Sequence, residues 1–259
     1  MSATVLAAST LYVVAFREDA PVGSEPITLD NPGAHQPSPD SLDRDSIPSR
    51  GTGGDREPIT EPTAEVTVSG PTAGGRVQPA PVDSPDSASG HYLVVPGGDA
   101  APERMSGDTV RYLVEVEEGL PFEAEEFAEQ VHTILNDERG WGHDGSMRFE
   151  RVDDSSAAFR VSLSSPDLTD EQCYPLLTRG EVSCWNGSRA IINAQRWGVG
   201  AETYGADILS YREYLINHEV GHALGHGHVS CPAAGEPAPT MVQQTKSLQG
   251  CAPNPWPAR

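Results

Sequence analysis

The chain after about residue 88 contains several short segments in which apolar and polar residues follow a strand pattern. Residues 111–117 (RYLVEVE) alternate with a period of two, and residues 91–97 (HYLVVPG) form a short extended apolar run. Both patterns predict β-strands. Residues 147–152 (MRFERV) and 157–164 (AAFRVSLS) predict two further strands, and the short polar turn between them predicts a hairpin.

Two longer segments have apolar residues at the spacing of an amphipathic helix. In residues 121–137, a proline and several acids come early, and apolar positions recur every three to five residues: Phe122, Phe127, Val131 and Ile134. In residues 207–225, no Gly or Pro interrupts the chain before Gly221, and apolar residues again recur at helical spacing: Ile208, Tyr211, Leu215 and Leu224. These segments predict the two main helices.

An Asn-Gly pair lies between two apolar runs further along the chain. Asn186 and Gly187 follow residues 182–185 (VSCW) and precede a run that includes residues 190–194 (AIINA). Asn-Gly is the strongest short-range signal for a β-hairpin, so both flanking runs are expected to be strands. Residues 229–259 are rich in Pro, Gly and Cys and lack periodicity, which predicts an irregular segment.

Composition divides the chain into unequal parts. Residues 20–106 contain 14 Pro and 11 Gly, and Tyr92 is the only aromatic residue among them. Little apolar surface is available there to offset the entropy of ordering the chain. We therefore expect a disordered tether over residues 18–87 and one folded domain over residues 88–259.

The N-terminal segment and the cysteines both bear on the compartment. Residues 3–16 (ATVLAASTLYVVAF) are apolar and have the length of a signal-peptide core, but no Lys or Arg precedes them and no clean cleavage site follows. Residues 1–17 are thus interpreted as a signal peptide or an uncleaved signal anchor. The alternatives for the protein are secretion and tethering to the outer face of the cytoplasmic membrane.

The four cysteines are even in number and include no CxxC pair, which favours two disulfides over a thiolate metal site. Three pairings are possible. We favour Cys173 with Cys184 and Cys231 with Cys251, because both close short loops. Disulfides imply an oxidising compartment, and the alternative is four buried thiols in a cytosolic protein.

The formal net charge of −21 argues against a phosphate-binding surface. We therefore expect no nucleic-acid partner. Acidic excess of this size is more often a source of solubility than of recognition. The protein is expected to be a monomer.

Residues 218–228 (HEVGHALGHGH) contain the strongest chemical signal in the chain. His218 and His222 are four residues apart, so on a helix they lie on the same face and can share one metal ion. Along a straight helix His228 would be about 9 Å beyond His222, so the chain must turn back to bring it to the same ion. Gly225 stands where a left-handed helix-ending residue is needed for that turn.

Glu219 is poorly placed as a fourth ligand, which leaves one coordination position for water and favours a catalytic zinc site. Three neutral imidazoles keep the full charge of the ion, so its water ionises near pH 7 and Glu219 is placed to act as general base. A rival ligand set uses His226 in place of His228. Those three histidines would span about 12 Å along a continuous helix, so His226 is expected beside the site or facing solvent.

The pattern HExxHxxGxxH resembles that of the metzincin zinc peptidases. That superfamily pairs the pattern with a downstream methionine turn beneath the metal, and Met241 in the sequence PTM is the matching residue. The wider context over residues 88–259, including RYLVEVEEGL, SCWNGSRAIINA and YLINHEVGHALGHGH, resembles an actinobacterial family of exported metzincin-like domains whose substrates are unassigned.

The resemblance implies an α+β fold with a twisted, mostly parallel sheet, one antiparallel edge strand, two main helices and an irregular C-terminal subdomain. It also implies a peptide or protein substrate bound along the edge strand, here near residues 182–194. Gln243 replaces the tyrosine that assists zinc in some branches, so no tyrosine switch is expected. No cysteine precedes Cys173, which excludes latency through a propeptide thiolate.

The function predicted from these observations is an exported metalloendopeptidase that contains one catalytic Zn²⁺. One alternative is an exported binding or cell-wall-associated module in which the metal is structural. Another is a hydrolase of cell-wall peptides. A purely structural metal site would not need Glu219, so this residue discriminates between the first two hypotheses.

Overall fold

The computed structural model describes residues 70–258 of the chain. The predicted signal or anchor segment, residues 1–17, lies outside the described residues, as does the tether up to residue 69. Between residues 70 and 258, no helix combines the length and the apolar character that a membrane crossing requires.

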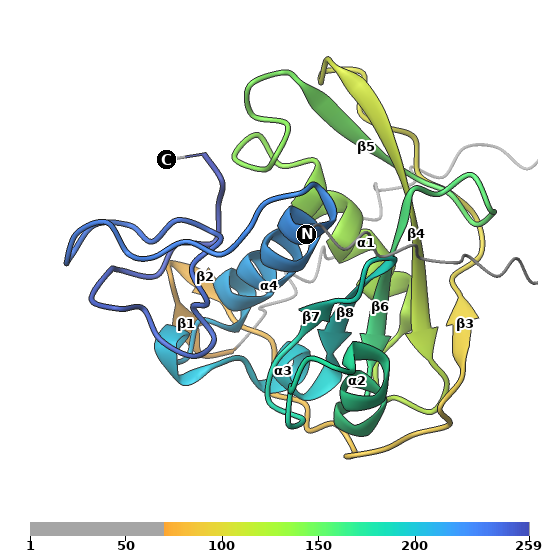
Figure 1. Ribbon diagram of the computed structural model, residues 1–259, viewed down its shortest axis with the longest axis horizontal. Coiled ribbons are helices and arrows are strands. Elements are labelled where there is room, and N and C mark those ends of the chain that lie inside the picture. Colours follow the sequence, from red (N-terminus) through yellow and green to blue (C-terminus); the bar gives the residue numbers. More distant parts are fainter. Residues whose placement is uncertain (1–69, 259) are drawn as a thin grey trace, which may run out of the picture. The chain divides into compact units, whose positions relative to one another are not determined.

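A mixed six-stranded sheet forms the centre of the fold (Figure 1). Its strands in spatial order are β3 (Tyr92–Val94), β4 (Asp108–Glu117), β6 (Phe159–Ser164), β8 (Arg189–Asn193) and β7 (Cys184–Trp185), and β5 (Met147–Arg151) also pairs with β4. Strands β4, β5, β6 and β8 run parallel, whereas β3 and β7 pair antiparallel with their neighbours. The predicted α+β class with a mostly parallel sheet is confirmed, and β3 adds a second antiparallel strand to the one expected.

Strands β5 and β6 do not form the predicted hairpin. Both run parallel to β4, with β5 beside residues 108–112 and β6 beside residues 112–116. The ten residues of β4 are long enough to accept one strand along each half. The local turn signal was therefore overridden by pairing with a long central strand.

The two helices predicted from periodicity are α1 (Ala124–Leu135) and α4 (Ile208–Ala223). Two short helices were not predicted, α2 (Pro166–Cys173) and α3 (Ala194–Val199), and a 3-10 helix, η1, spans Glu202–Tyr204. Both short helices begin with recognisable caps, because the Ser165 side chain accepts a hydrogen bond from the Leu168 amide and the Asn193 side chain accepts one from the Gln195 amide. Their brevity hides the helical periodicity, so only the caps signal them.

Helix α4 is the most buried of the helices. It packs on β8 and α1, and the C-terminal segment, dark blue in Figure 1, covers it on another side. One buried cluster joins the sheet to both long helices and includes Tyr112, Val161, Ile192, Phe127, Val131, Leu215 and Ile216. Because α4 is surrounded in this way, even its polar residues His218 and Glu219 are only 4% exposed.

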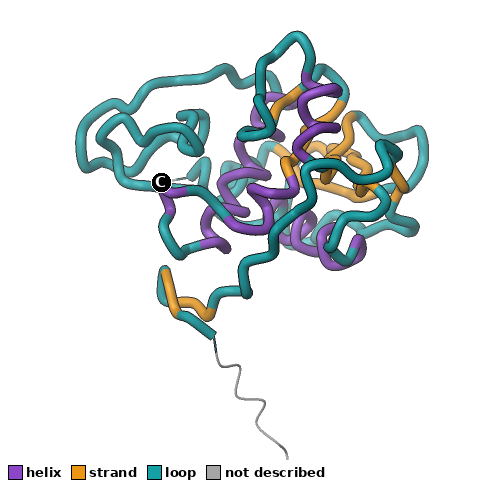
Figure 2. Tube along the Cα trace, turned by 90° about the horizontal axis from the view of Figure 1, so that it is seen from below, coloured by secondary structure: helices purple, strands orange, loops and turns teal. Residues whose placement is uncertain are grey.

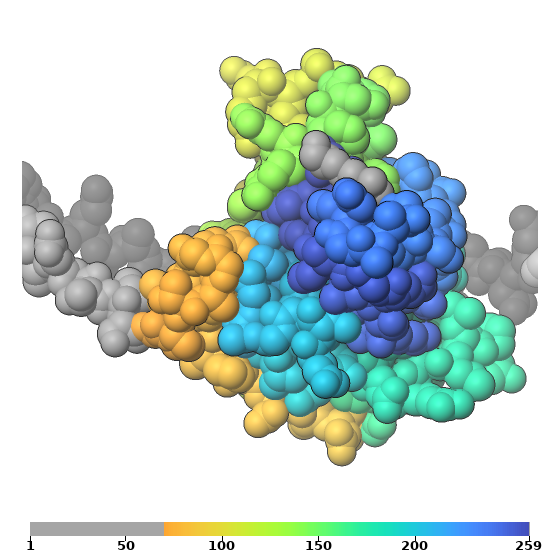
Figure 3. All heavy atoms as spheres, turned by 90° about the vertical axis from the view of Figure 1, so that its left-hand side faces the viewer, coloured from red at the N-terminus to blue at the C-terminus, as the bar shows by residue number. Residues whose placement is uncertain are grey.

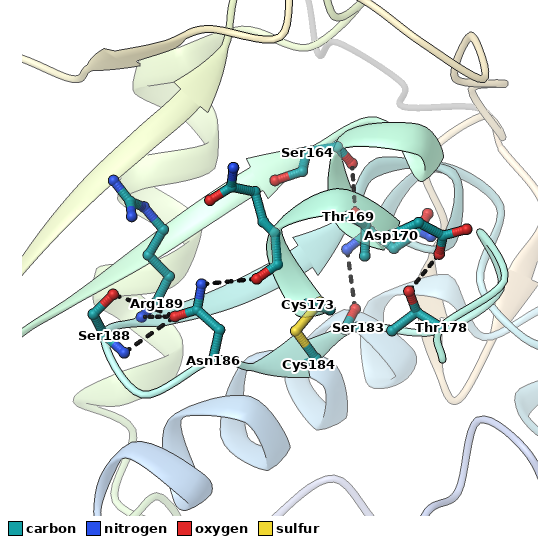
Figure 4. Close-up of a disulfide and its surroundings, with 12 residues drawn as sticks. Ser164, Thr169, Asp170, Cys173, Thr178, Ser183, Cys184, Asn186, Ser188 and Arg189 are labelled. Atoms are coloured by element: carbon teal, nitrogen blue, oxygen red, sulfur yellow. Dashed lines mark hydrogen bonds between the residues drawn. A yellow bond between two sulfur atoms is a disulfide. The ribbon is translucent and has the colours of Figure 1, made fainter. Parts of the chain in front are cut away.

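The structure forms two disulfides, Cys173–Cys184 and Cys231–Cys251, which are the pairings expected from the loop lengths. The first joins the end of α2 to the short strand β7, beside the Asn186 turn (Figure 4). The second closes a loop within the irregular C-terminal segment. Two disulfides indicate an oxidising, extracytoplasmic compartment.

Residues 70–87, assigned to the tether on composition, contact the domain instead. A hairpin of β1 (Thr72–Ala73) and β2 (Arg76–Val77), seen in Figure 2 at the start of the described chain, lies against the beginning of α4. The same contact appears in Figure 3 as the orange segment beside the light blue surface. These contacts are polar, and a composition rule based on apolar content does not detect them.

Gln78 is the centre of this contact. Its side-chain oxygen accepts a hydrogen bond from the Leu209 amide at 3.0 Å, which caps an N-terminal amide of α4 that has no partner within the helix. Its side-chain nitrogen donates to the Ala73 carbonyl at 2.8 Å and to Asp207 at 3.2 Å. Arg76 adds a hydrogen bond to Ser210 and an ion pair with Glu213.

We predict that Gln78→Ala lowers the free energy of unfolding by about 1–2 kcal/mol, because it leaves a helix-terminal amide without its partner and removes the hydrogen bonds to Ala73 and Asp207. Urea unfolding of the full chain followed by circular dichroism measures the change. Gln172→Ala is the matched control, since no hydrogen bond of the Gln172 side chain is found in the described part. Equal, small effects of the two substitutions would show that residues 70–87 do not stabilise α4.

Candidate metal centre

The end of α4 brings three histidines together. His218 and His222 lie one turn apart on the helix, which ends at Ala223. Gly225 has a φ of 93°, and the His226 amide donates to the Gly221 carbonyl at 2.9 Å, which closes the helix end in a left-handed turn. The chain then doubles back and presents His228 to the other two rings, as the sequence predicted.

The imidazole nitrogens of the three rings converge. The Nε2 atom of His228 is 3.2 Å from that of His218 and 3.0 Å from that of His222. A ligand atom from each of the three lies within 4.8 Å of the others, so the group could hold a metal ion. His226 is not part of the group, which removes the rival ligand set.

The backbone determines which nitrogens carry protons. The Nδ1 atoms of His218 and His222 are each 2.8 Å from a carbonyl oxygen, those of Thr240 and His226 respectively. A carbonyl only accepts, so both Nδ1 atoms must donate and both Nε2 atoms carry lone pairs. Burial lowers the pKa of His218 to about 3, which keeps its ring neutral at pH 7.

These lone pairs need a partner that the histidines do not supply. If the Nε2 atom of His228 carried a proton, it could donate to only one of the two facing nitrogens. A cation at the point where the three nitrogens meet would satisfy all of them. Carbonyl bonds on the opposite ring nitrogens are also the arrangement that orients histidine ligands in metal sites, so the residues fit a metal ion.

His226 contributes through its ring and its backbone. Its ring stacks on Trp141, with centroids 4.3 Å apart and planes 17° from parallel. Trp141 in turn donates its indole N–H to the Asn217 carbonyl on α4 at 3.0 Å. The backbone oxygen of His226 accepts a hydrogen bond from Nδ1 of His222. Stacking of the His226 ring on Trp141 therefore helps to fix the carbonyl that orients His222.

Met241 packs against Gly221 of α4. A side chain added at Gly221 would come within 2.5 Å of the Met241 sulfur and 2.6 Å of the Trp141 ring, so no larger residue fits between His218 and His222. The Met241 backbone accepts from the Val229 amide, and its neighbour Thr240 accepts from His218. The role of Gly221 was missed from sequence, although a glycine inside a helical pattern is a signal of close approach.

Three tyrosines attach the C-terminal segment to α4 and its approach. The Tyr214 hydroxyl donates to the Val242 carbonyl at 3.1 Å and accepts from the Gln244 amide at 2.8 Å. Tyr204 donates to the Gln244 side chain, and Tyr211 bonds Thr245. Periodicity marked Tyr211 only as an apolar position, because a hydroxyl's partner cannot be identified from spacing.

Glu219 is buried without a hydrogen bond. Its Oε2 atom has no partner among the described residues, and the side chain is 4% exposed. Burial raises the pKa of Glu219 to about 8. The described fold gives this carboxyl no structural hydrogen bond. Its notable feature is its position beside His218 and His222.

A cavity of about 450 Å³ opens over this group. His218, His222, His228 and Glu219 line its floor. The surrounding wall includes Leu176, Leu177, Trp185, Gln243 and Lys246. Trp185 lines this cavity, whereas Trp197 is buried in the core.

The turn at Asn186 and Gly187 forms the expected hairpin between β7 and β8. The Asn186 side chain accepts hydrogen bonds from the Ser188 and Arg189 amides and donates to the Gln172 carbonyl (Figure 4). These bonds use the Asn186 amide within the turn. The hairpin therefore accounts for the Asn-Gly-Ser sequence, which also matches a glycosylation site.

Comparison with known proteins gives a family but no activity. No curated protein and no solved structure matches the chain significantly. A family described as "Protein of unknown function (DUF3152)" matches residues 78–257, which begin at the residue that caps α4 and include the whole histidine group. The chain therefore belongs to the DUF3152 family.

Proposed function

We propose that the protein is a zinc-dependent peptidase that acts outside the cytoplasm. The observation that carries the proposal is the convergence of three histidine nitrogens beside a buried carboxyl that has no partner in the described fold. A structural metal site is usually closed by four protein ligands. This group has three nitrogen ligands and opens into a cavity large enough for part of a peptide.

His218, His222 and His228 would hold the zinc ion. Three imidazole ligands with an open fourth position are typical of catalytic zinc, and the neutral ring nitrogens suit it. When bound, the ion supplies a Lewis acid that polarises a carbonyl and lowers the pKa of a water. The carbonyls of Thr240 and His226 keep the two helix histidines in the tautomer that this requires.

Glu219 is proposed to move the proton. Its carboxylate, which lines the floor of the cavity, would take a proton from the attacking water and pass it to the amine nitrogen as the peptide C–N bond breaks. A cation held by the three histidines would favour the ionised carboxylate, which burial alone disfavours. The buried Oε2 atom has no partner in the described fold, so no hydrogen bond there competes for the carboxylate. Burial on all other sides excludes bulk water from the carboxyl, so protons reach it only through the cavity.

The substrate is proposed to bind beside β7. This two-residue strand is the last in the sheet, so its outer backbone groups are available to an added strand. Cys184 and Trp185 of β7 line the cavity, and the Cys173–Cys184 disulfide attaches the strand to α2. Leu176 and Leu177, which are 54% and 76% exposed, extend an apolar wall beyond the cavity.

One prediction of the proposed function concerns the histidine ligands of the zinc ion. His228→Ala should reduce zinc content of the purified full chain from one ion to well below one half, because two remaining ligands do not form a stable site. His226→Phe is the matched control, since it keeps the ring stacked on Trp141 and the backbone carbonyl that orients His222. Metal analysis by mass spectrometry decides the matter, and loss of zinc in His226→Phe alone would refute the ligand set.

Another prediction of the proposed function concerns Glu219. Glu219→Gln keeps the shape and removes the base, so zinc content and melting temperature should change little, while peptide hydrolysis falls by about 100- to 10,000-fold. Turnover of a peptide library by the zinc-loaded full chain, read by mass spectrometry, measures this.

Two results would oppose the proposal. Undiminished hydrolysis in Glu219→Gln would place the chemistry elsewhere. A zinc-loaded parent that cleaves no library member, and behaves like Glu219→Gln, would favour a binding module with a structural metal.

A further inference from the structure

The cavity over the histidines contains the only lysine of the whole chain. Lys246 lines the wall beside His228, and no other Lys or Arg side chain lines this cavity. The rest of the chain uses arginine for its positive charges, within a formal net charge of −21. The cation is thus in an unusual position for this sequence and requires an explanation.

Lys246 is not used by the described fold. All seven ion pairs among residues 70–258 are formed by arginine, and Lys246 enters none of them. Its side chain is exposed and forms no side-chain hydrogen bond in that range. A charge that serves stability alone would be expected to pair with one of the many acids of this chain.

The backbone around Lys246 is nevertheless held firmly. The Lys246 and Ser247 amides both donate to the Gln243 carbonyl, at 3.0 and 3.1 Å. The preceding residues are attached to α4 and its approach, Thr245 through Tyr211 and the fully buried Gln244 through Tyr204. The backbone at Lys246 is therefore fixed at the edge of the cavity, while the flexible side chain can move its ammonium group within it.

Lys246 shares the cavity with the proposed site. It lines the same cavity as His218, His222, His228 and Glu219, and its side chain is exposed. A substrate held by the histidine group would therefore occupy the cavity whose lining includes this ammonium.

We infer that Lys246 selects substrates that carry a carboxylate next to the cleaved bond. The inference rests on the proposed function and adds a substrate class to it. A single ammonium matches the single charge of a carboxylate, whereas a phosphate dianion is usually held by several donors, often arginine. The carboxylate can be the C-terminus of a peptide or an Asp or Glu side chain, and the apolar wall at Leu176 and Leu177 takes the neighbouring residue.

The absence of other lysines provides a direct probe of binding. Reductive methylation with ¹³C-formaldehyde keeps the charge and labels only Lys246 and the N-terminal amine, which Lys246→Arg distinguishes. The experiment uses the zinc-loaded full chain carrying Glu219→Gln, so that no peptide is consumed. The Lys246 signal should shift on addition of acetyl-Leu-Leu-Ala with a free carboxylate and much less with its amide.

The second pair of probes separates the two sources of carboxylate. Acetyl-Leu-Leu-Asp amide and acetyl-Leu-Leu-Asn amide differ only in the side-chain charge. A shift with the free C-terminus alone assigns a carboxypeptidase-like preference, and a shift with the Asp peptide alone assigns an acidic side-chain preference. No carboxylate-dependent shift with either pair overturns the inference.

Kinetics on the parent enzyme test the same residue independently. Lys246→Gln should raise KM about 5- to 10-fold for a carboxylate-bearing substrate and change it less for the matched amide, equivalent to about 1–1.4 kcal/mol. Lys246→Arg should restore most of the loss, and Arg111→Gln, which removes an exposed charge outside the cavity, controls for net charge. An equal fall in kcat for both substrates would mean that Lys246 acts on the reaction, and would overturn the inference.

The two proposals fail in different ways. If the parent cleaves no peptide but the Lys246 signal still shifts only with carboxylates, the carboxylate site stands and the peptidase proposal does not. If peptides are cleaved and neither the signal nor KM depends on a carboxylate, the peptidase stands and the assignment of Lys246 is wrong.

Discussion

The structure depends on keeping a polar helix buried. Helix α4 carries His218, Glu219 and Asn217 into the interior, where polar groups without partners are costly. The burial of His218 depends on the hydrogen bond from its Nδ1 atom to the Thr240 carbonyl. This bond satisfies one ring nitrogen and leaves the other for a ligand.

Two irregular segments make this burial possible. The C-terminal segment covers α4 through the Tyr214 bonds and the packing of Met241 against Gly221. The hairpin of β1 and β2 caps the start of the same helix through Gln78. Neither segment has much regular structure. Hydrogen bonds between side chains and backbone groups, together with the Cys231–Cys251 disulfide, hold them in place of the backbone hydrogen bonds of a sheet.

The side of α4 that carries the histidines opens into the cavity beside β7. The cavity there is lined by apolar residues such as Leu176 and Leu177, by Lys246, and by the histidines and Glu219. In the proposed function, a peptide would bind with an apolar residue at Leu177 and a negative charge at Lys246. A site built on a rigid helix and a disulfide-held strand also keeps its groups in register without a bound ligand.

Patterns with a fixed period were readable from the sequence alone. They include α1, α4, the central strands, the Asn186 hairpin, and the spacing that brings His218, His222 and His228 together through the turn at Gly225. Tertiary structure alone decided the pairing of β5 and β6 with β4, the contact of residues 70–87, and the surroundings of Gly221 and Lys246. The physical reason is range: helix and turn geometry depend on neighbours along the chain, whereas strand partners, polar contacts and cavity walls depend on residues that folding brings together from far apart.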